Sequence, residues 1–439
     1  TRQIGIGMQL YLSDNDDAIL PSMLLSRRVS LLKPSSTVAV MNTAAALKAQ
    51  GIPVISFAAG EPDFDTPKVV KDAAIAALNA GQTKYMPTPG DAPTRKAIAD
   101  KLSAENGIPN LTPDHVVISA GGKNSLYLVF QALLDAPAPG QPPWDVLLPV
   151  PAWVSYAPIA ELSGGRVVEL PTTPDSAFKI SPAQLERAIT PRSRVLVLNS
   201  PSNPCGTMYS PDELRDLAAV VERAAASIAP DLCIVSDEIY EKIIFGGIPH
   251  CSIGAFPGVA ERTITVNGLS KAFAMTGWRV GYAAGSGPFG LQVAQALSKL
   301  QGQVTTCLPA FIYPAIRAAL AHCAADVESM RQAFASRAEL IFSLASRLPN
   351  LPAVRPTGAF YLFPDIAAHL GTTSASGRAV RTPADFAQAL LDEQRVALVP
   401  GEDFGGPPAH HVRISFACSD DDIREGMRRL GEFLRGLKR

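Results

Sequence analysis

Short apolar runs alternate with amphipathic, helix-like segments from about residue 115 onward. One such segment is Pro211–Ser227, where Ser210 can cap a helix and Pro211 suits its first position. Strand–helix alternation of this kind predicts an α/β fold with a mostly parallel sheet that helices cover on both faces. The expected strands are Val116–Ser119, Val146–Val150, Val195–Asn199, Cys233–Asp237, Ile264–Asn267 and Val280–Ala284.

The C-terminal part has a different pattern. Pro383–Gln394 reads as a helix capped by Thr382, and Val396–Val399 reads as a short strand. A last helix is expected to begin at Ser419, and its buried face consists of Ile423, Met427, Leu430 and Leu434. Helices mixed with short strands predict a smaller α+β domain. The loops 137–144 and 371–382, which are rich in proline or small polar residues, are expected to be exposed.

Composition excludes several classes of protein. The 39 Lys and Arg residues balance 40 Asp and Glu residues, so the net charge of -1 offers no surface for nucleic acid or an anionic membrane. No apolar run reaches the roughly 18 residues that span a bilayer. Six scattered cysteines without a C-x-x-C pair indicate reduced thiols and a cytoplasmic location.

The first 22 residues stand apart from the rest. They lack a basic segment followed by an apolar one, so they do not read as a signal peptide. They weakly resemble part of a bacterial pseudopilin-type sequence, and Met23 is an alternative start of the main part of the chain. We therefore expect residues 1–22 to form an N-terminal extension.

The stretch NGLSKAFAMTGWRVGY (267–282) carries the strongest chemical signal. Lys271 follows an apolar strand, and Arg279 lies eight residues later. Ligands bind at the ends of strands in an open α/β sheet. A lone lysine after a strand is usually a solvated surface residue. Held in a partly desolvated place near another cation, however, a lysine can be a neutral amine nucleophile that forms a Schiff base.

This string closely resembles the lysine motif of class I aminotransferases, which depend on pyridoxal 5'-phosphate (PLP). The resemblance covers almost the whole chain from Met23 and is strongest to the aspartate/prephenate aminotransferase subgroup. It implies the PLP-dependent transferase fold type I, with a large domain (70–329) that holds a mixed, mostly parallel sheet and a small α+β domain made of 23–69 and 330–439. It also implies transamination between an L-amino acid, aspartate or glutamate, and a 2-oxo acid such as 2-oxoglutarate, oxaloacetate or prephenate.

The resemblance further implies roles for individual residues. Lys271 would bind the cofactor covalently and then move the substrate proton. Asp237 and Tyr240 both lie in SDEIYE. Asp237 would pair with the pyridine nitrogen, and Tyr240 would bond the 3'-oxygen together with Asn203, which lies in NSPSNPCGT. Trp153 would stack on the ring. The remaining cofactor contacts would come from Gly121, Gly122, Lys123, Ser270 and Arg279, most of them around the phosphate, where glycines that open a helix suit an anion.

Substrate and partner contacts follow in the same way. Arg413, in VRISFACS, would bind the α-carboxylate with two parallel hydrogen bonds, and Gly60 would let the backbone approach it. Lys123 and Thr37 would select a distal carboxylate. The other substrate contacts would be Trp153 and Asn203. Tyr85 would reach the phosphate of a neighbouring subunit, which implies a homodimer with shared sites.

Several alternatives stay open or are set aside. The segment 301–309 should line the partner's site, but Cys307 and Leu308 depart from the family pattern and leave room for aromatic or neutral amino acids. A PLP-dependent lyase or cyclopropane-forming synthase shares most cofactor residues. A PLP-binding transcription regulator is not expected, because the short segment 1–22 leaves no room for a DNA-binding module and the charge is balanced. A binding protein without catalytic activity is not expected either. The string GSGPFG lacks the acidic partner of a dinucleotide site, and the adjacent His410 and His411 do not make a metal site.

Overall fold

The computed structural model describes residues 26–30, 32, 36–406 and 410–439, and only the backbone of residues 27, 30 and 36–38. The chain divides into two compact units, Thr1–Pro34 and Ser35–Arg439. The first contains α1 (Arg27–Ser30), and the expected extension 1–22 lies outside the described residues. The second unit carries all the features described below.

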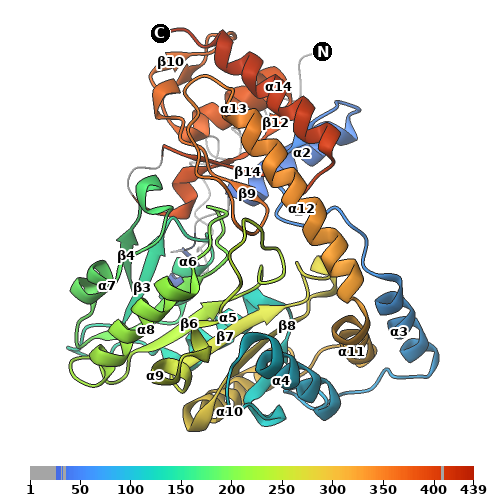
Figure 1. Cartoon of the computed structure of the whole chain (residues 1–439), viewed down its shortest axis with the longest axis vertical. Coiled ribbons are helices and arrows are strands. Elements are labelled where there is room, and N and C mark those ends of the chain that lie inside the picture. Colours follow the sequence, from blue (N-terminus) through green and yellow to red (C-terminus); the bar gives the residue numbers. More distant parts are fainter. Residues whose placement is uncertain (1–25, 31, 33–35, 407–409) are drawn as a thin grey trace, which may run out of the picture. The chain divides into compact units, whose positions relative to one another are not determined.

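A seven-stranded sheet forms the centre of the second unit (Figure 1). Its order is β2-β8-β7-β6-β5-β3-β4. Strands β3 to β7 pair in parallel, whereas β8 runs antiparallel to both β2 and β7. The mostly parallel sheet is thus confirmed. The strands are β2 (Val116–Ser119), β3 (Asp145–Val150), β4 (Arg166–Pro171), β5 (Ser193–Asn199), β6 (Cys233–Asp237), β7 (Thr263–Gly268) and β8 (Gly281–Gly285).

The strands expected for this sheet are all present, and β4 is one that we did not predict. It lies at the edge of the sheet and exposes three of its six residues. Its polar residues Arg166 and Glu169 interrupt the apolar run that marks the buried strands. An edge strand tolerates such residues because only one of its sides pairs with another strand.

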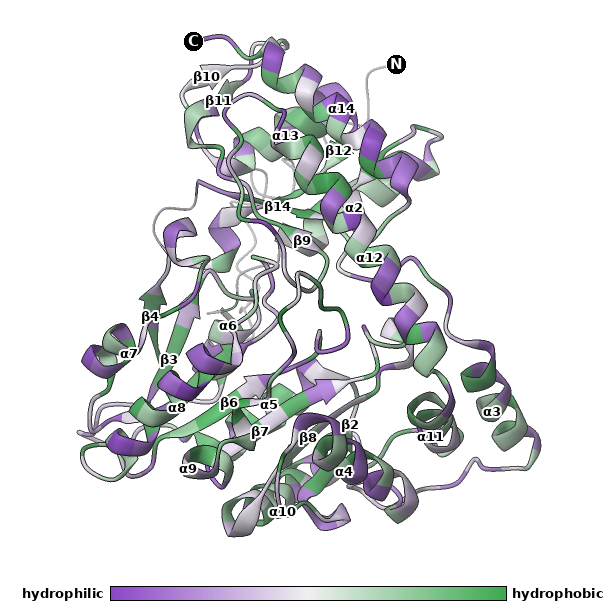
Figure 2. Cartoon of the chain, viewed as in Figure 1, coloured by the Kyte–Doolittle hydropathy of each residue, from purple (hydrophilic) through white to green (hydrophobic). Residues whose placement is uncertain are grey.

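Both faces of the sheet are buried. In β5, Val195 and Val197 pack in the core of one face, while Leu196 and Leu198 pack in that of the other. Successive side chains of a strand point to opposite faces, so a continuous apolar run is what a doubly covered sheet requires. In Figure 2 the central strands are largely green, whereas α8 and α14 carry both colours.

Helices cover the two faces in separate groups. Helices α5 (Gly122–Leu133), α6 (Tyr156–Leu162) and α10 (Gly287–Val304) supply one core. The opposite face is covered in two parts, and its helices are α3 (Lys68–Asn79), α4 (Ala92–Asn106), α7 (Pro182–Ala188), α8 (Pro211–Ala225), α9 (Pro257–Ala260) and α11 (Ile312–His322). Helix α8 begins as predicted, because Ser210 and Glu213 cap each other's backbone N–H groups at 3.2 and 2.7 Å.

A second hydrophobic core lies around the C-terminal elements. Ile55 and Phe57, from the early part of the chain, share it with Ile423 and Met427 of the last helix. Its helices are α12 (Ala324–Ala345), α13 (Pro383–Gln394) and α14 (Asp420–Gly436), with α2 (Ser36–Ala49) beside them. Its strands are β1 (Ile55–Ser56), β9 (Tyr361–Leu362), β12 (Val396–Ala397), β13 (Val399–Pro400) and β14 (Val412–Ser415).

Two expectations for this region were wrong in detail. Residues 396–399 do not form one strand, because the chain leaves β12, paired with β1, and enters β13, paired with β14. The segment 371–382 is not simply an exposed loop. It contains the antiparallel pair β10 (Thr372–Thr373) and β11 (Ala379–Val380), and Val380 is fully buried. The caps at Thr382 and Ser419 and the exposure of residues 137–142 are confirmed.

Short 3-10 helices complete the described fold at Pro113–His115, Pro174–Ser176, Ile253–Ala255, Thr276–Trp278, Ala367–His369 and Gly401–Phe404. Among the described residues, no helix is both long and apolar enough to span a bilayer.

Candidate active site

A cavity of about 470 Å³ lies at the carboxyl ends of β5 and β6, where Asn199 and Asp237 form part of its wall. This size suits a small organic ligand, and strand ends are the usual binding edge of an open α/β sheet. Residues of the seven-stranded sheet line the cavity together with Tyr361 and Arg413 of the C-terminal region. The predicted site residues among its lining are Gly60, Gly122, Lys123, Trp153, Asn203, Asp237, Tyr240, Ser270, Lys271, Arg279 and Arg413.

Lys271 lies just beyond β7, and its side chain is largely enclosed. Its Nζ donates a hydrogen bond to the carbonyl oxygen of Gly60. Burial lowers the pKa of Lys271 to about 8, and the positive charges of Arg413 and Arg279 act in the same direction, against the carboxylate of Glu61. At pH 7 roughly a tenth of the amine is therefore neutral, and this is the form that a nucleophilic lysine requires.

Asp237 ends β6 as a buried carboxyl group. The Tyr156 hydroxyl donates to its Oδ2 at 2.7 Å, and the Ile239 N–H donates to its Oδ1 at 3.2 Å. Burial raises the pKa of Asp237 to about 6, while these two bonds oppose the rise. The carboxylate is still the major form at pH 7, and a cationic nitrogen beside it would lower that pKa again.

Arg413 and Asn203 hold each other at the cavity wall. Arg413 Nη1 donates to the Asn203 side-chain oxygen and Nη2 to the Ala58 carbonyl, both at 2.9 Å. The guanidinium stacks 4.6 Å from the ring centre of Tyr361. Its Nε is buried and has no partner among the described residues. Because the bond occupies the oxygen of Asn203, the amide donors of Asn203 are left to face a ligand.

The amino end of α5 forms a second wall with Arg279. Gly121 precedes the helix at φ +90°, and a Cβ there would collide with the Arg279 guanidinium. In the described part of the chain, no hydrogen bond uses the N–H of Gly122 or Lys123. Free first-turn amides next to a guanidinium make a suitable place for a phosphate or another anion.

Lys123 and Trp153 lie together at another side of the cavity. The Lys123 ammonium is 4.9 Å from the Trp153 ring centre, and the ring of Trp153 meets Tyr156 edge to face at 5.3 Å. Burial and the charge of Arg279 lower the pKa of Lys123. The cavity therefore combines a flat aromatic surface with a cation in addition to Arg413.

Sequence reasoning missed several residues of this cavity. Tyr156 bonds Asp237, and the hydroxyl of Tyr361 lies 2.8 Å from that of Tyr240. Tyr156 lies in the string PAWVSY and Tyr361 in the string GAFYLF. Periodicity alone assigns both tyrosines to the core. The other unpredicted lining residues are Met41, Glu61, Leu126, Asn199, Ile239 and Thr276.

Some expected residues lie elsewhere. Tyr85 is 89% exposed and outside the cavity of its own chain. Thr37 belongs to α2 by its backbone, but its side chain lies outside the described residues. The segment 301–309 was expected to face a partner, and for Gln301 and Leu308 this is wrong. Gln301 is fully buried against the Thr88 and Ile118 carbonyls, and Leu308 is buried in its own chain.

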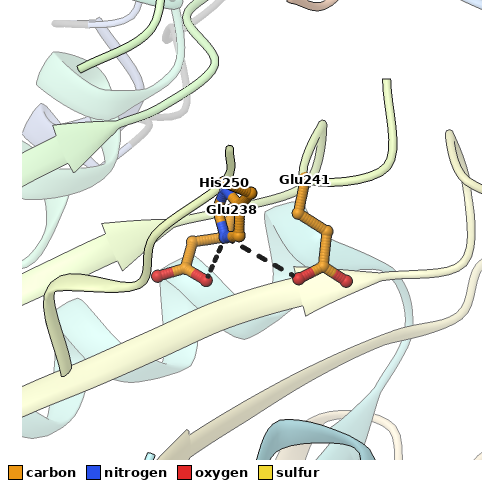
Figure 3. Close-up of side chains that lie close together, drawn as sticks. All are labelled: Glu238, Glu241 and His250. Atoms are coloured by element: carbon orange, nitrogen blue, oxygen red, sulfur yellow. Dashed lines mark hydrogen bonds and ion pairs between the residues drawn. The ribbon is translucent and has the colours of Figure 1, made fainter. Parts of the chain in front are cut away.

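Glu238, Glu241 and His250 lie close enough together to suggest a metal site (Figure 3). The donors around them argue otherwise. The Lys101 ammonium bonds Glu241, and the Asn106 amide donates to Glu238 and Glu241 at 3.0 and 2.8 Å. A lysine and an amide thus occupy the positions from which the carboxylates would bind a cation. We describe this group as a buried ion-pair network.

The sequence profile of the family "Aminotransferase class I and II" matches residues 52–430. The chain belongs to this aminotransferase family. It is 40% identical over 413 residues to an aspartate aminotransferase of Geobacillus stearothermophilus, covering 94% of this chain and 99% of the relative. The aspartate/prephenate aminotransferase of Thermus thermophilus is 41% identical over 413 residues, covering 93% and 98%.

Solved aminotransferases share the fold. An aspartate aminotransferase from Thermus thermophilus with maleate has a TM-score of 0.83 at 40% identity, covering 94% of this chain and all of that one. An aspartate aminotransferase from Rhizobium meliloti has a TM-score of 0.86 at 35% identity, with 95% of this chain and 100% of that chain covered. The family and the fold type I architecture expected from the lysine motif are therefore confirmed.

Proposed function

We propose that this aminotransferase uses pyridoxal 5'-phosphate and transfers amino groups from aspartate or glutamate to 2-oxo acids. The observation that carries the proposal is the convergence of three groups on one cavity: the desolvated amine of Lys271, the buried carboxyl group of Asp237 and the guanidinium of Arg413. Relatives named for aspartate and prephenate support the same choice.

The donor set fits the cofactor. The free amides in the first turn of α5 and the Arg279 guanidinium suit its phosphate, the indole of Trp153 suits its ring, and Asp237 suits its pyridinium nitrogen. Ser270, buried beside Lys271, adds a hydroxyl. When bound, the cofactor supplies a conjugated ring that withdraws electrons from the substrate α-carbon.

The side chains perform the remaining tasks. Lys271 would bind the cofactor covalently and would carry the proton from the substrate α-carbon as a neutral base. The carboxylate of Asp237 would lie beside the ring nitrogen. Tyr240 and the amide donors of Asn203 would donate to the ring oxygen.

The substrate carboxylates meet two cations. Arg413 binds the α-carboxylate, and its bonds to Asn203 and Ala58 fix the guanidinium before substrate arrives. Lys123 lies across the cavity beside Trp153 and binds the distal carboxylate of aspartate, glutamate or prephenate. We assign Thr37 and Gly60 to the substrate side as well. A substrate with two carboxylates would satisfy both cations, which a neutral amino acid cannot do.

We further propose a cytoplasmic homodimer in which Tyr85 reaches the partner's cofactor phosphate. The exposure of Tyr85, together with that of Val304 at 57%, supports a contact surface there. The division into an extension (1–22), a small domain (23–69 with 330–439) and a large domain (70–329) is likewise our proposal. The shared core of Ile55, Phe57 and the C-terminal helices supports it.

A single half-reaction tests the proposal. PLP-loaded protein would be mixed separately with aspartate, glutamate, phenylalanine and alanine, while the cofactor absorbance is followed and the oxo acid is assayed. We expect conversion of the cofactor to its amine form, with one equivalent of oxaloacetate or 2-oxoglutarate, and prephenate would then be tried as acceptor. A response to phenylalanine or alanine alone would discard the acidic substrate. No amine form with any donor would point to a lyase.

A further inference from the structure

We propose that Tyr361 is a positioning residue for this aminotransferase: it donates its phenol hydrogen to the Tyr240 hydroxyl and thereby directs the Tyr240 hydrogen into the cavity. The inference rests on the proposed function, because it concerns how Tyr240 meets the cofactor. It assigns a task to a residue of β9, in the C-terminal region, that would act on the cofactor through Tyr240.

The two phenols form a closed pair. Their oxygens are 2.8 Å apart, and their rings meet edge to face at 5.8 Å and 84°. Tyr361 is 1% exposed and Tyr240 is 3% exposed, so water does not compete for the bond. Among the described residues, the Tyr240 hydroxyl is the single hydrogen-bond partner of the Tyr361 hydroxyl.

The direction of this bond follows from hydrogen counting. A hydroxyl has one hydrogen to donate and two lone pairs to accept with. The ring oxygen of PLP carries negative charge in its reactive form, so it accepts hydrogen bonds. Tyr240 can donate to that oxygen only when its bond with Tyr361 is one that it accepts. Tyr361 must therefore be the donor within the pair.

Arg413 favours the same direction. Its guanidinium lies 4.6 Å from the Tyr361 ring centre, where a cation stabilises negative charge on the phenol and strengthens its O–H as a donor. Burial raises the pKa of both phenols. The charge of Arg413 opposes the rise for both phenols, whereas the bond between the two hydroxyls opposes it for Tyr361 and adds to it for Tyr240. The more acidic phenol is the better donor.

The backbone around Tyr361 leaves space for this arrangement. A Cβ at Gly60 would lie 2.8 Å from the Tyr361 oxygen, so glycine is needed where the hydroxyl approaches the chain. Tyr361 itself is fixed in β9 by pairing with Ser415 of β14, next to Arg413. Strand pairing thus sets both the phenol and the guanidinium from one small sheet.

The test measures the pH at which the bound cofactor changes its visible absorbance, in wild type, Tyr361→Phe, Tyr240→Phe and the double variant. Losing a donor that polarises Tyr240 should weaken the hold on the ionised ring oxygen. We expect Tyr361→Phe to raise the midpoint by about half a pH unit, roughly threefold in the proton equilibrium. In the Tyr240→Phe background the same substitution should add no shift.

Two controls separate this role from a structural one. Tyr313→Phe also removes a buried hydroxyl, and it should leave the midpoint unchanged. Among the described residues, this hydroxyl accepts one hydrogen bond, from the Leu308 N–H at 3.3 Å. Equilibrium binding of maleate should stay the same in Tyr361→Phe, which keeps the ring over Arg413, and weaken in Tyr361→Leu.

An unshifted midpoint in Tyr361→Phe, or a shift that persists without the Tyr240 hydroxyl, would overturn the inference alone. Wild-type protein that binds no PLP would remove the proposed function together with it.

Discussion

At the scale of single residues, burial decides which protonation states are available in the cavity. Desolvation lowers the pKa of Lys271 to about 8 and raises that of Asp237 to about 6, so the cavity holds a partly neutral amine next to a carboxylate. For both groups, burial is the largest cause of the pKa shift. The burial of the two side chains thus prepares both groups for proton transfer.

Replacing the amine tests the role of Lys271 directly. We expect Lys271→Ala to lose at least ~10²-fold to 10⁴-fold in transamination rate, because the base that moves the α-proton is gone. Lys299→Ala, which removes an exposed lysine of α10, is the matched control and should keep wild-type turnover. Steady-state kinetics with aspartate and 2-oxoglutarate would show the difference. Near-normal turnover in Lys271→Ala would refute the assignment.

At the scale of secondary-structure elements, strand β8 and helix α5 meet without side chains between them. A Cβ at Gly281 would overlap the backbone of Gly121 and Gly122, which begin the helix. This close contact sets the amino end of α5 against the sheet, and the free amides at that end form the proposed phosphate site. A small residue in the strand therefore determines where an anion can bind.

Gly281→Ala should displace the first turn of α5. We expect a loss of about 1–3 kcal/mol in the free energy of unfolding, because extra volume enters a packed contact, together with weaker PLP binding. Gly277→Ala is the control from the same segment, since its Cβ would meet nothing within 4 Å, and it should change stability by less than ~0.5 kcal/mol. Chemical denaturation and fluorescence titration with PLP would measure both. Equal effects of the two substitutions would contradict the proposed contact.

A buried network also links elements behind the cavity. Its members come from α4 (Lys101), from the turn after β6 (Glu238 and Glu241) and from the loop that carries His250. With one lysine against two carboxylates, a protonated His250 completes the charge balance. Burial alone would lower the pKa of His250, but the bond to Glu238 and the two negative charges raise it above 6.5.

The raised pKa has a defined effect on stability. A group whose folded-state pKa is raised stabilises the fold fully below its unfolded pKa and loses that contribution as pH rises through the folded value. The stability advantage of wild type over His250→Gln should therefore shrink from pH 6 to pH 9. His322→Gln, at an exposed position at the end of α11, is the control for replacing a histidine outside this network. Urea unfolding of the cofactor-free protein at each pH checks this. An advantage that grows with pH would be the wrong sign.

At the scale of the whole molecule, the proposed dimer places residues of two chains in each site. A subunit with Lys271→Ala and a subunit with Tyr85→Ala should then complement each other, because the mixed dimer has one site with neither defect. Refolding equal amounts together should recover roughly a quarter of wild-type activity if subunits pair at random. Sites contained within single chains would give the mean activity of the two separate variants. Sedimentation velocity of each sample would establish that dimers are present.

Much of this protein could be predicted from its sequence because the relevant signals are local. The buried strands are continuous apolar runs, and α8, α13 and α14 begin at side chains that cap them. The lysine motif and the strings around Asp237 and Asn203 lie at strand ends, where the fold class alone directs them toward one edge. The mostly parallel sheet, the aminotransferase family and more than half of the residues that line the cavity therefore followed from the order of residues.

Tertiary structure decided what depends on neighbours distant in the chain. The bond from Tyr361 to Tyr240 spans 121 positions, and the contact between Arg413 and Asn203 spans 210. No periodicity records such pairs. Edge strand β4 and the division between β12 and β13 depend on which strand pairs with each of them. The burial of Leu308 depends on packing against distant residues of its own chain. Local sequence encodes most of the elements, but only packing determines which side chains meet and how far water is excluded from them.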